Sequence, residues 1–115
     1  MSHIKLTFEV SSSSGWDILA VGGEVDIATA AQLRQRLDDF TDGETKHLAL
    51  DLTNVGFMDS TGLGVLVATS RTLMRAGGRL AVVADQPSLT KVFEITSLGQ
   101  VMHICPRLED LPPVP

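Results

Sequence analysis

A serine hydroxyl lies between a carboxylate and a threonine in the segment Asp59-Ser60-Thr61, just before an apolar run that starts at Leu63. These residue types are typical of a helix start, and the first turn of a helix carries unpaired N–H groups and about half a positive charge. Those groups could stabilise a phosphate attached to Ser60. Gly62 and Gly64 lack side chains, so another molecule could approach this turn closely. The segment predicts an ordinary N-cap, a modification and binding site, or both together.

Ser60 could instead be a nucleophile if a general base lay beside it. The candidate bases are His3, His47 and His103. His3 is close to the N-terminus, His47 enters a predicted strand at the other end of the sheet, and His103 falls on the last predicted strand. No spacing in the sequence links these histidines to the serine, so we predict no catalytic triad and no enzymatic activity of the chain itself.

Motifs for nucleotides and metals are incomplete. Gly62-Leu63-Gly64 continues as Val65-Leu66-Val67, so the third glycine of G-x-G-x-x-G is absent, and neither G-x-x-x-x-G-K-[ST] nor G-x-S-x-G occurs. His103 and Cys105 would point to the same side of an extended chain, but a zinc site needs three or four ligands. We therefore expect no metal and no cofactor.

Three carboxylates, Asp26, Asp51 and Asp59, could form the acidic cluster of a receiver domain, which is phosphorylated on an aspartate. A receiver begins with a strand and a helix and carries an acidic pair after its first strand. This chain begins with a predicted hairpin, has no such pair there, and lacks a lysine at the end of a late strand. The pattern therefore disfavours a receiver.

Composition narrows the possible partners and the location. The 115 residues, the length of one domain, carry nine Lys+Arg against fourteen Asp+Glu, a net charge of −5. The chain has no cluster of Lys and Arg of the kind that binds nucleic acid. No apolar run approaches the roughly 18 residues of a membrane span. The N-terminus does not resemble a signal peptide, and the lone Cys105 cannot form an intrachain disulfide, so we expect a cytoplasmic protein.

Hydrophobic periodicity predicts the elements. A first strand is expected over residues 4–10, a mobile hairpin loop over 11–15, and an antiparallel second strand over 16–21 that Gly22-Gly23 ends. Helices are expected after Asp26 or Thr29, after Asp59 and from Pro87. Buried strands are expected at 48–52 and 80–84, and a last short strand at 101–104. Residues 53–58 read as a connection packed on the core. The residues expected on one face of the second helix are Leu63, Leu66, Val67, Ser70, Met74 and Gly77.

The resulting order is β-β-α-β-α-β-α-β. It predicts an α/β domain with a mixed, mostly parallel sheet that opens with an antiparallel hairpin and has helices packed on it. We expect a single domain over residues 1–105, followed by an extended, proline-rich C-terminal tail over 106–115.

The nine residues from Phe57 to Val65, in single letters FMDSTGLGV, closely resemble the signature of the bacterial anti-sigma-factor antagonists, the stand-alone STAS domains. Leu50-Asp51-Leu52, Gly23-Glu24-Val25-Asp26 and Gly77-Gly78 are similar to the family as well. The resemblance covers residues 4 to 105 and implies a STAS-type fold.

The resemblance also implies a function. Such proteins bind a cognate anti-sigma factor, usually also a serine kinase, and so free the sigma factor. Phosphorylation of the serine after the aspartate abolishes binding, and a separate serine phosphatase restores it. That serine corresponds to Ser60, and Asp26 and Asp59 match family positions at the binding surface. Thr61, where the family often has a second serine, leaves a second hydroxyl as a possible site; Gly62 and Leu63 complete the expected binding residues.

Phosphorylation would add about −1.5 to −2 charges beside Asp59. We hypothesise that the switch is local repulsion at the interface, without a change of fold. The alternative function is a STAS scaffold, or a module that binds a small anion or nucleotide at the Ser60 turn, in another signalling or lipid-transport complex.

Overall fold

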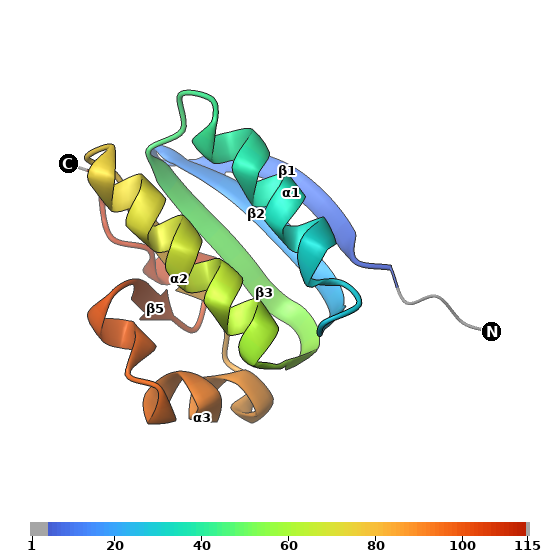
Figure 1. Ribbon diagram of the computed structural model, residues 1–115. Coiled ribbons are helices and arrows are strands. Elements are labelled where there is room, and N and C mark those ends of the chain that lie inside the picture. Colours follow the sequence, from blue (N-terminus) through green and yellow to red (C-terminus); the bar gives the residue numbers. More distant parts are fainter. Residues whose placement is uncertain (1–4, 115) are drawn as a thin grey trace.

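A five-stranded sheet in the order β1-β2-β3-β4-β5 organises the chain (Figure 1). The computed structural model describes residues 5–114. Strand β1 pairs antiparallel with β2, and every later neighbour is parallel, as predicted. In chain order the elements are β1 (Thr7–Ser13), β2 (Trp16–Val25), α1 (Ala30–Thr41), β3 (His47–Met58), α2 (Ser60–Arg75), β4 (Arg79–Val83), α3 (Pro87–Ile95), a short 3₁₀ helix (Leu98–Gln100), β5 (His103–Cys105) and a second 3₁₀ helix (Leu108–Asp110).

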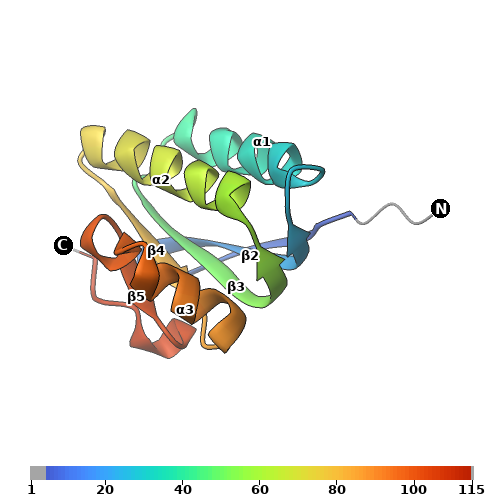
Figure 2. The ribbon, with the colours of Figure 1, turned by 60° about the horizontal axis from the view of Figure 1, so that its bottom comes forward.

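Helices α1 and α2 lie side by side on one face of the sheet (Figures 1 and 2). Right-handed connections between neighbouring parallel strands place successive helices on the same face. The main core lies between these helices and the sheet, and it is built from aliphatic side chains with no exposed surface, such as Leu33, Leu50, Leu66 and Val82. This packing places the start of α2 at the carboxyl end of β3.

Helix α3 is tied to the last part of β3 by one side chain. The amide nitrogen Nε2 of Gln86 donates to the carbonyl of Leu52 at 2.6 Å and to that of Val55 at 2.7 Å. Pro87 occupies the first turn of the helix, where the missing N–H costs nothing. The start of α3 is thus anchored to the strand that leads to Ser60.

The opposite face of the sheet is covered by the segment after β5. Trp16, Ile18, Ala49 and Ala81 form a second apolar cluster against which Leu108, Leu111 and Val114 pack. The indole Nε1 of Trp16 donates to the Pro112 carbonyl at 2.9 Å. Residues 106–114, expected as an extended tail, therefore include a 3₁₀ turn and lie against the domain. The division of the chain at residue 105 stays a prediction.

The first hairpin is tighter than the sequence predicted. Residues 11–13 belong to β1 and pair with the start of β2, so the expected mobile loop is wrong there. Only Ser14 and Gly15 form the turn, with φ values of 53° and 88°, the two positive values that a two-residue hairpin turn needs. The sequence does not predict a strand at residues 11–13 because β1 is an exposed edge strand there, and its serines show no alternation of apolar and polar residues.

Strands β2 and β3 are also longer than predicted. β2 continues through Gly22-Gly23 to Val25, and β3 runs to Met58, so the predicted break and the predicted connection over 53–58 are wrong. The pairing passes the glycines through two register irregularities, and Gly23 adopts a φ of 117°, which a residue with a side chain rarely does.

The buried face of α2 is rotated from the prediction. Thr69 and Leu73 are buried with Leu66 and Ser70, whereas Met74 is 56% exposed. Ser70 is buried as predicted, and its hydroxyl donates to the Val101 carbonyl at 2.6 Å, so this side of the helix faces the segment after α3.

Candidate functional site

Ser60 is the first residue of α2, and its side chain is exposed. Asp59 is the N-cap, as the sequence predicted. Its Oδ1 accepts hydrogen bonds from the backbone N–H of Thr61 at 2.9 Å and of Gly62 at 3.3 Å. The backbone of Asp59 is extended, with φ −97° and ψ −173°, which is the usual N-cap conformation. The cap fixes where the helix begins and so presents the Ser60 hydroxyl to the outside.

The ends of β2 and β3 hold this turn from below. The N–H of Asp59 donates to the Val25 carbonyl at 3.0 Å, and Val25 pairs with Met58 across the two strands. Gly62 is buried, and a Cβ there would come within 2.7 Å of Met58 Cγ and of Val25 Cγ1. Its missing side chain therefore lets α2 approach its own sheet.

Gly64 differs from Gly62. It is exposed, and a Cβ there would meet no atom within 4 Å. Of the two glycines expected to open the turn to another molecule, only Gly64 leaves free space on the outside of the helix. Leu63, between them, is half-buried against the core.

The loop from β2 to α1 brings Asp26 to the same end of the sheet, directly after Val25. The Asp26 Oδ1 accepts from the backbone N–H of Ala28 at 2.9 Å and of Thr29 at 3.1 Å. The buried Thr29 hydroxyl donates to the Glu24 carbonyl at 2.6 Å and accepts from the Asp26 N–H at 3.0 Å. The loop is thus held by side-chain hydrogen bonds within it, and Asp26 lies one residue from the contact between Val25 and Asp59.

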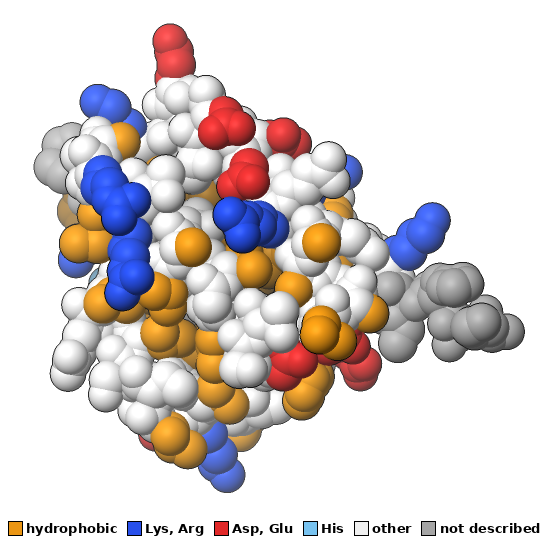
Figure 3. Space-filling model, viewed as in Figure 1, with side chains coloured by type: hydrophobic (Ala, Val, Ile, Leu, Met, Phe, Trp, Pro, Cys, Tyr) orange, Lys and Arg blue, Asp and Glu red, His pale blue; other side chains and the backbone are white. Residues whose placement is uncertain are grey.

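Two apolar side chains beside these carboxylates are exposed, and sequence reasoning missed both. Ile27 is 82% exposed, and Phe57, expected to pack on the core, is 47% exposed. Figure 3 shows hydrophobic and acidic side chains side by side over the β3–α2 turn and the β2–α1 loop. The only sequence signal for the exposure of Phe57 is strand alternation with the buried Met58, and this signal requires residues 53–58 to be a strand.

The backbone donors at the start of α2 are largely occupied. The Asp59 carboxylate accepts hydrogen bonds from the N–H groups of Thr61 and Gly62. The Asp59 backbone carbonyl accepts one from the N–H of Leu63 at 3.1 Å. Of the first-turn amides only that of Ser60 lacks an acceptor among residues 5–114. A phosphate on Ser60 would therefore lie beside a carboxylate and face outward, unless it displaced the cap.

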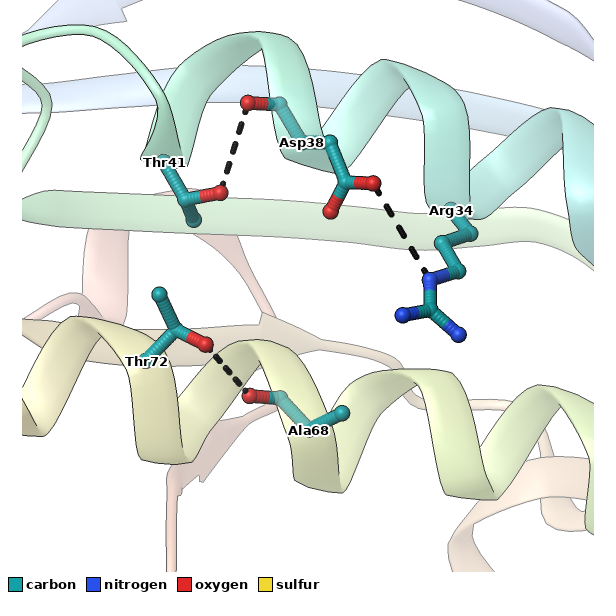
Figure 4. A network of polar contacts seen from close by, with 5 residues as sticks. All are labelled: Arg34, Asp38, Thr41, Ala68 and Thr72. Atoms are coloured by element: carbon teal, nitrogen blue, oxygen red, sulfur yellow. Dashed lines mark hydrogen bonds and ion pairs between the residues drawn. The ribbon is translucent and has the colours of Figure 1, made fainter.

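A groove of about 260 Å³ runs from Thr61 along the seam between α1 and α2. Figure 4 shows the Arg34 guanidinium reaching from α1 into the space between the helices. Arg34 Nε lies 3.9 Å from the Asp38 carboxylate, and because both side chains are more than half exposed, the pair contributes little to stability. The acidic surface around Ser60 thus borders a cation that another molecule can engage.

The other candidate residues lie elsewhere. His47 begins β3, whereas Ser60 lies two residues beyond the end of that strand, so the two are a strand length apart. The His47 and Trp16 rings form a T-shaped pair with centroids 5.7 Å apart. Asp51 accepts hydrogen bonds from the N–H and hydroxyl of Thr53 at 3.0 and 2.7 Å. Within residues 5–114, no three His, Cys, Asp or Glu side chains gather as they would around a metal ion.

Cys105 is buried at the end of β5. Burial raises the pKa of its thiol above the ordinary value, and the nearby charge of Asp110 raises it further, while a hydrogen bond with the Arg107 backbone acts in the opposite direction. A protonated, shielded thiol is a poor nucleophile. The helices in the described part of the chain are all too short or too polar to cross a bilayer.

Comparison with known proteins identifies the family. The model of the STAS domain matches residues 7–111. An anti-sigma-B factor antagonist of Staphylococcus aureus is 32% identical over 101 residues, which cover 88% of this chain and 94% of that protein. A related antagonist of Staphylococcus epidermidis is 31% identical over the same lengths.

Solved structures agree. An anti-sigma factor antagonist from Mycobacterium paratuberculosis superposes with a TM-score of 0.84 at 31% identity, covering 91% of this chain and 89% of that one. The anti-sigma factor antagonist SpoIIAA in its unphosphorylated form gives 0.69 at 21% identity over 90% and 92%, a likeness of fold alone. The names of these relatives describe regulators.

Proposed function

The chain belongs to the STAS domain family, and we propose that it acts as an anti-sigma-factor antagonist whose unphosphorylated form binds an anti-sigma factor and thereby frees a sigma factor. The observation that carries the proposal is the exposed Ser60 at the start of α2, beside Asp59 and two exposed apolar side chains. The names of relatives at 31–32% identity support it.

The docking surface proposed here is made of exposed and half-buried groups at this end of the sheet. Ile27 and Phe57 supply apolar area, which stabilises a complex by about 25 cal/mol for each Å² removed from water. Asp26 and Asp59 supply charge that favours a basic partner surface. Gly62 is buried and contributes only indirectly, because its missing side chain lets α2 lie close to the strands. The docking surface comprises the exposed Ile27, Phe57, Ser60 and Thr61 and the half-buried Asp26, Asp59 and Leu63.

Phosphorylation of Ser60 is proposed as the switch. The phosphate adds about −1.5 to −2 charges, and the N–H groups that could neutralise it are already bound to Asp59. In a complex this charge must lose its water next to a second anion, which costs several kcal/mol. Since about 1.4 kcal/mol is a tenfold change in affinity, one phosphate is enough to release the partner with the fold unchanged.

The anti-sigma factor is proposed to be the serine kinase that modifies Ser60, and a serine phosphatase to reverse the step. Binding of a small anion or nucleotide at this turn is the weaker candidate, because the Asp59 carboxylate occupies the donors such a ligand would use.

The assignment is tested by incubating the chain with ATP and candidate anti-sigma kinases and locating the phosphate by mass spectrometry. We expect it on Ser60, and we expect the Ser60→Ala variant to remain unmodified. A phosphate found on Thr61 in the unaltered chain would show that the site is assigned wrongly.

A further inference from the structure

A cleft of about 530 Å³ opens between α3, the turn that follows α3, and β5. Figure 2 shows α3 next to β5, the last strand of the sheet, at the lower left. Small-molecule sites have volumes of roughly 300–1,000 Å³ and mostly apolar walls. The apolar residues that line this cleft are Ala84, Phe93, Ile104, Cys105 and Pro106.

The cleft lies beyond the carboxyl ends of two parallel strands. Ala84 and Asp85 follow β4, and Pro106 follows β5. No residue of the docking surface lines it, so the cleft is a separate feature of the domain.

The charge of the cleft has one sign. Asp85 and Glu94 are the charged residues in its lining, and both side chains are exposed at its edge. Among residues 5–114 the ion pairs involve neither of them. The remaining polar lining is neutral, from Thr90, Ser97 and Gln100, so no cation balances the two carboxylates.

We propose that this cleft binds a small organic cation with an apolar body, whose ammonium group is held by Asp85 and Glu94. The apolar walls select against a fully hydrated ion, and the carboxylates select against an anion of the same shape. A bare cluster of carboxylates would bind any cation, whereas this lining requires charge and apolar volume in one molecule.

The first experiment titrates the ¹⁵N-labelled chain with three probes of equal chain length: octylammonium chloride, 1-octanol and sodium octanoate. We expect amide shifts at Ala84, Glu94 and Gly99, with octylammonium binding at least tenfold tighter than octanol and octanoate not binding there. Equal affinity for the three probes, or the absence of shifts at the cleft, would overturn the proposal. Neither the probes nor the readout involves Ser60, so failure here and failure of the proposed function are distinguishable.

Two variants separate charge from volume. Asp85→Asn combined with Glu94→Gln keeps the shape, so the affinity for octylammonium should fall to that for octanol. Glu44→Gln, an exposed carboxylate in the loop before β3, is the matched control and should change nothing.

Gly99→Leu adds an apolar side chain at the wall of the cleft. Gly99 lines it, and a Cβ there meets no atom within 4 Å, so the variant should fold normally. We expect it to lose binding of octylammonium and octanol alike while its far-ultraviolet circular dichroism is unchanged. Unreduced binding by this folded variant, or retained preference for the ammonium probe in the charge variant, would contradict the proposal.

Discussion

Asp59 serves two purposes at the residue scale, because its carboxylate caps α2 and also places a negative charge beside Ser60. The two roles use different properties of the side chain. Capping needs an acceptor oxygen, which asparagine also has, whereas repulsion of a phosphate needs the charge. Substitutions at this one position can therefore separate stability from switching.

Asp59→Ala should lower the free energy of unfolding by about 0.5–2 kcal/mol, because the N–H groups of Thr61 and Gly62 lose their acceptor. Asp59→Asn should stay within a few tenths of a kcal/mol of the unaltered chain. Urea denaturation followed by circular dichroism measures both. Equal losses in the two variants would mean that the charge, and not the acceptor, stabilises the helix start.

Cys105 gives a pH prediction. Burial raises the pKa of the thiol in the folded state. In the unfolded chain the thiol has a pKa of about 8.5, so there is a pH range in which the unfolded thiol has lost its proton and the folded one keeps it. The thiol's contribution to stability is therefore complete below about pH 8.5 and is lost as pH rises toward the folded pKa. Cys105→Ala should show a shallower fall in unfolding free energy between neutral and alkaline pH, measured by urea denaturation at each pH. Parallel curves would show that the thiol is not shielded.

At the scale of elements, the approach of α2 to the ends of β2 and β3 decides where Ser60 lies. Gly62 makes that approach possible, and the hydrogen bond from Asp59 to Val25 fixes it. The order of elements could be predicted from the sequence because each helix carries its own periodicity and each buried strand its own apolar run. The exposed strand ends could not, because residues 11–13 and 53–58 pair through the backbone with little or no regular buried face.

The candidate site was only partly predictable for the same reason. Asp59 and Ser60 carry a local N-cap pattern, and that pattern is enough to place them. The exposure of Ile27 and Phe57 depends on how the β2–α1 loop and the end of β3 meet in space, which no local pattern records.

Gly62→Ala should destabilise the domain by about 1–3 kcal/mol, because the new Cβ would lie 2.7 Å from Met58 and Val25 side-chain atoms. Gly64→Ala is the matched control in the same helix. It meets open space and should stabilise the domain by up to about 1 kcal/mol, since alanine favours helix more than glycine does. Chemical denaturation of both variants measures the difference; a similar effect at the two positions would rule out the close approach.

At the scale of the whole molecule, the sheet is covered on both faces by different means. Two helices cover one face, and residues 108–114 cover part of the other through Leu108, Leu111 and Val114. This second cover lies over the hairpin end of β2, whereas the docking surface lies at its opposite end, ten residues along the strand. The two surfaces can therefore be altered independently.

Leu111→Ala should loosen the contact with the outer cluster and lower the free energy of unfolding by about 1–2 kcal/mol, less than for a fully buried leucine. Trp16 is the one tryptophan and the chain has no tyrosine, so its emission should shift to longer wavelength as water reaches the indole. Glu109→Ala, an exposed neighbour, serves as the control. An unchanged emission maximum in Leu111→Ala would show that this segment does not shield Trp16.

The central claim is that a negative charge at Ser60 releases the partner without altering the fold, and the affinity for a cognate anti-sigma factor, measured by isothermal titration calorimetry, tests it most directly. Ser60→Ala should bind as the unaltered chain does, and Ser60→Asp at least about tenfold more weakly, a loss of about 1.4 kcal/mol. Ser14→Asp adds the same charge in the hairpin turn, roughly 30 Å away along β2, where a positive φ suits aspartate, and should bind normally. Equal affinity of Ser60→Asp and the unaltered chain, with both folded, would contradict the account.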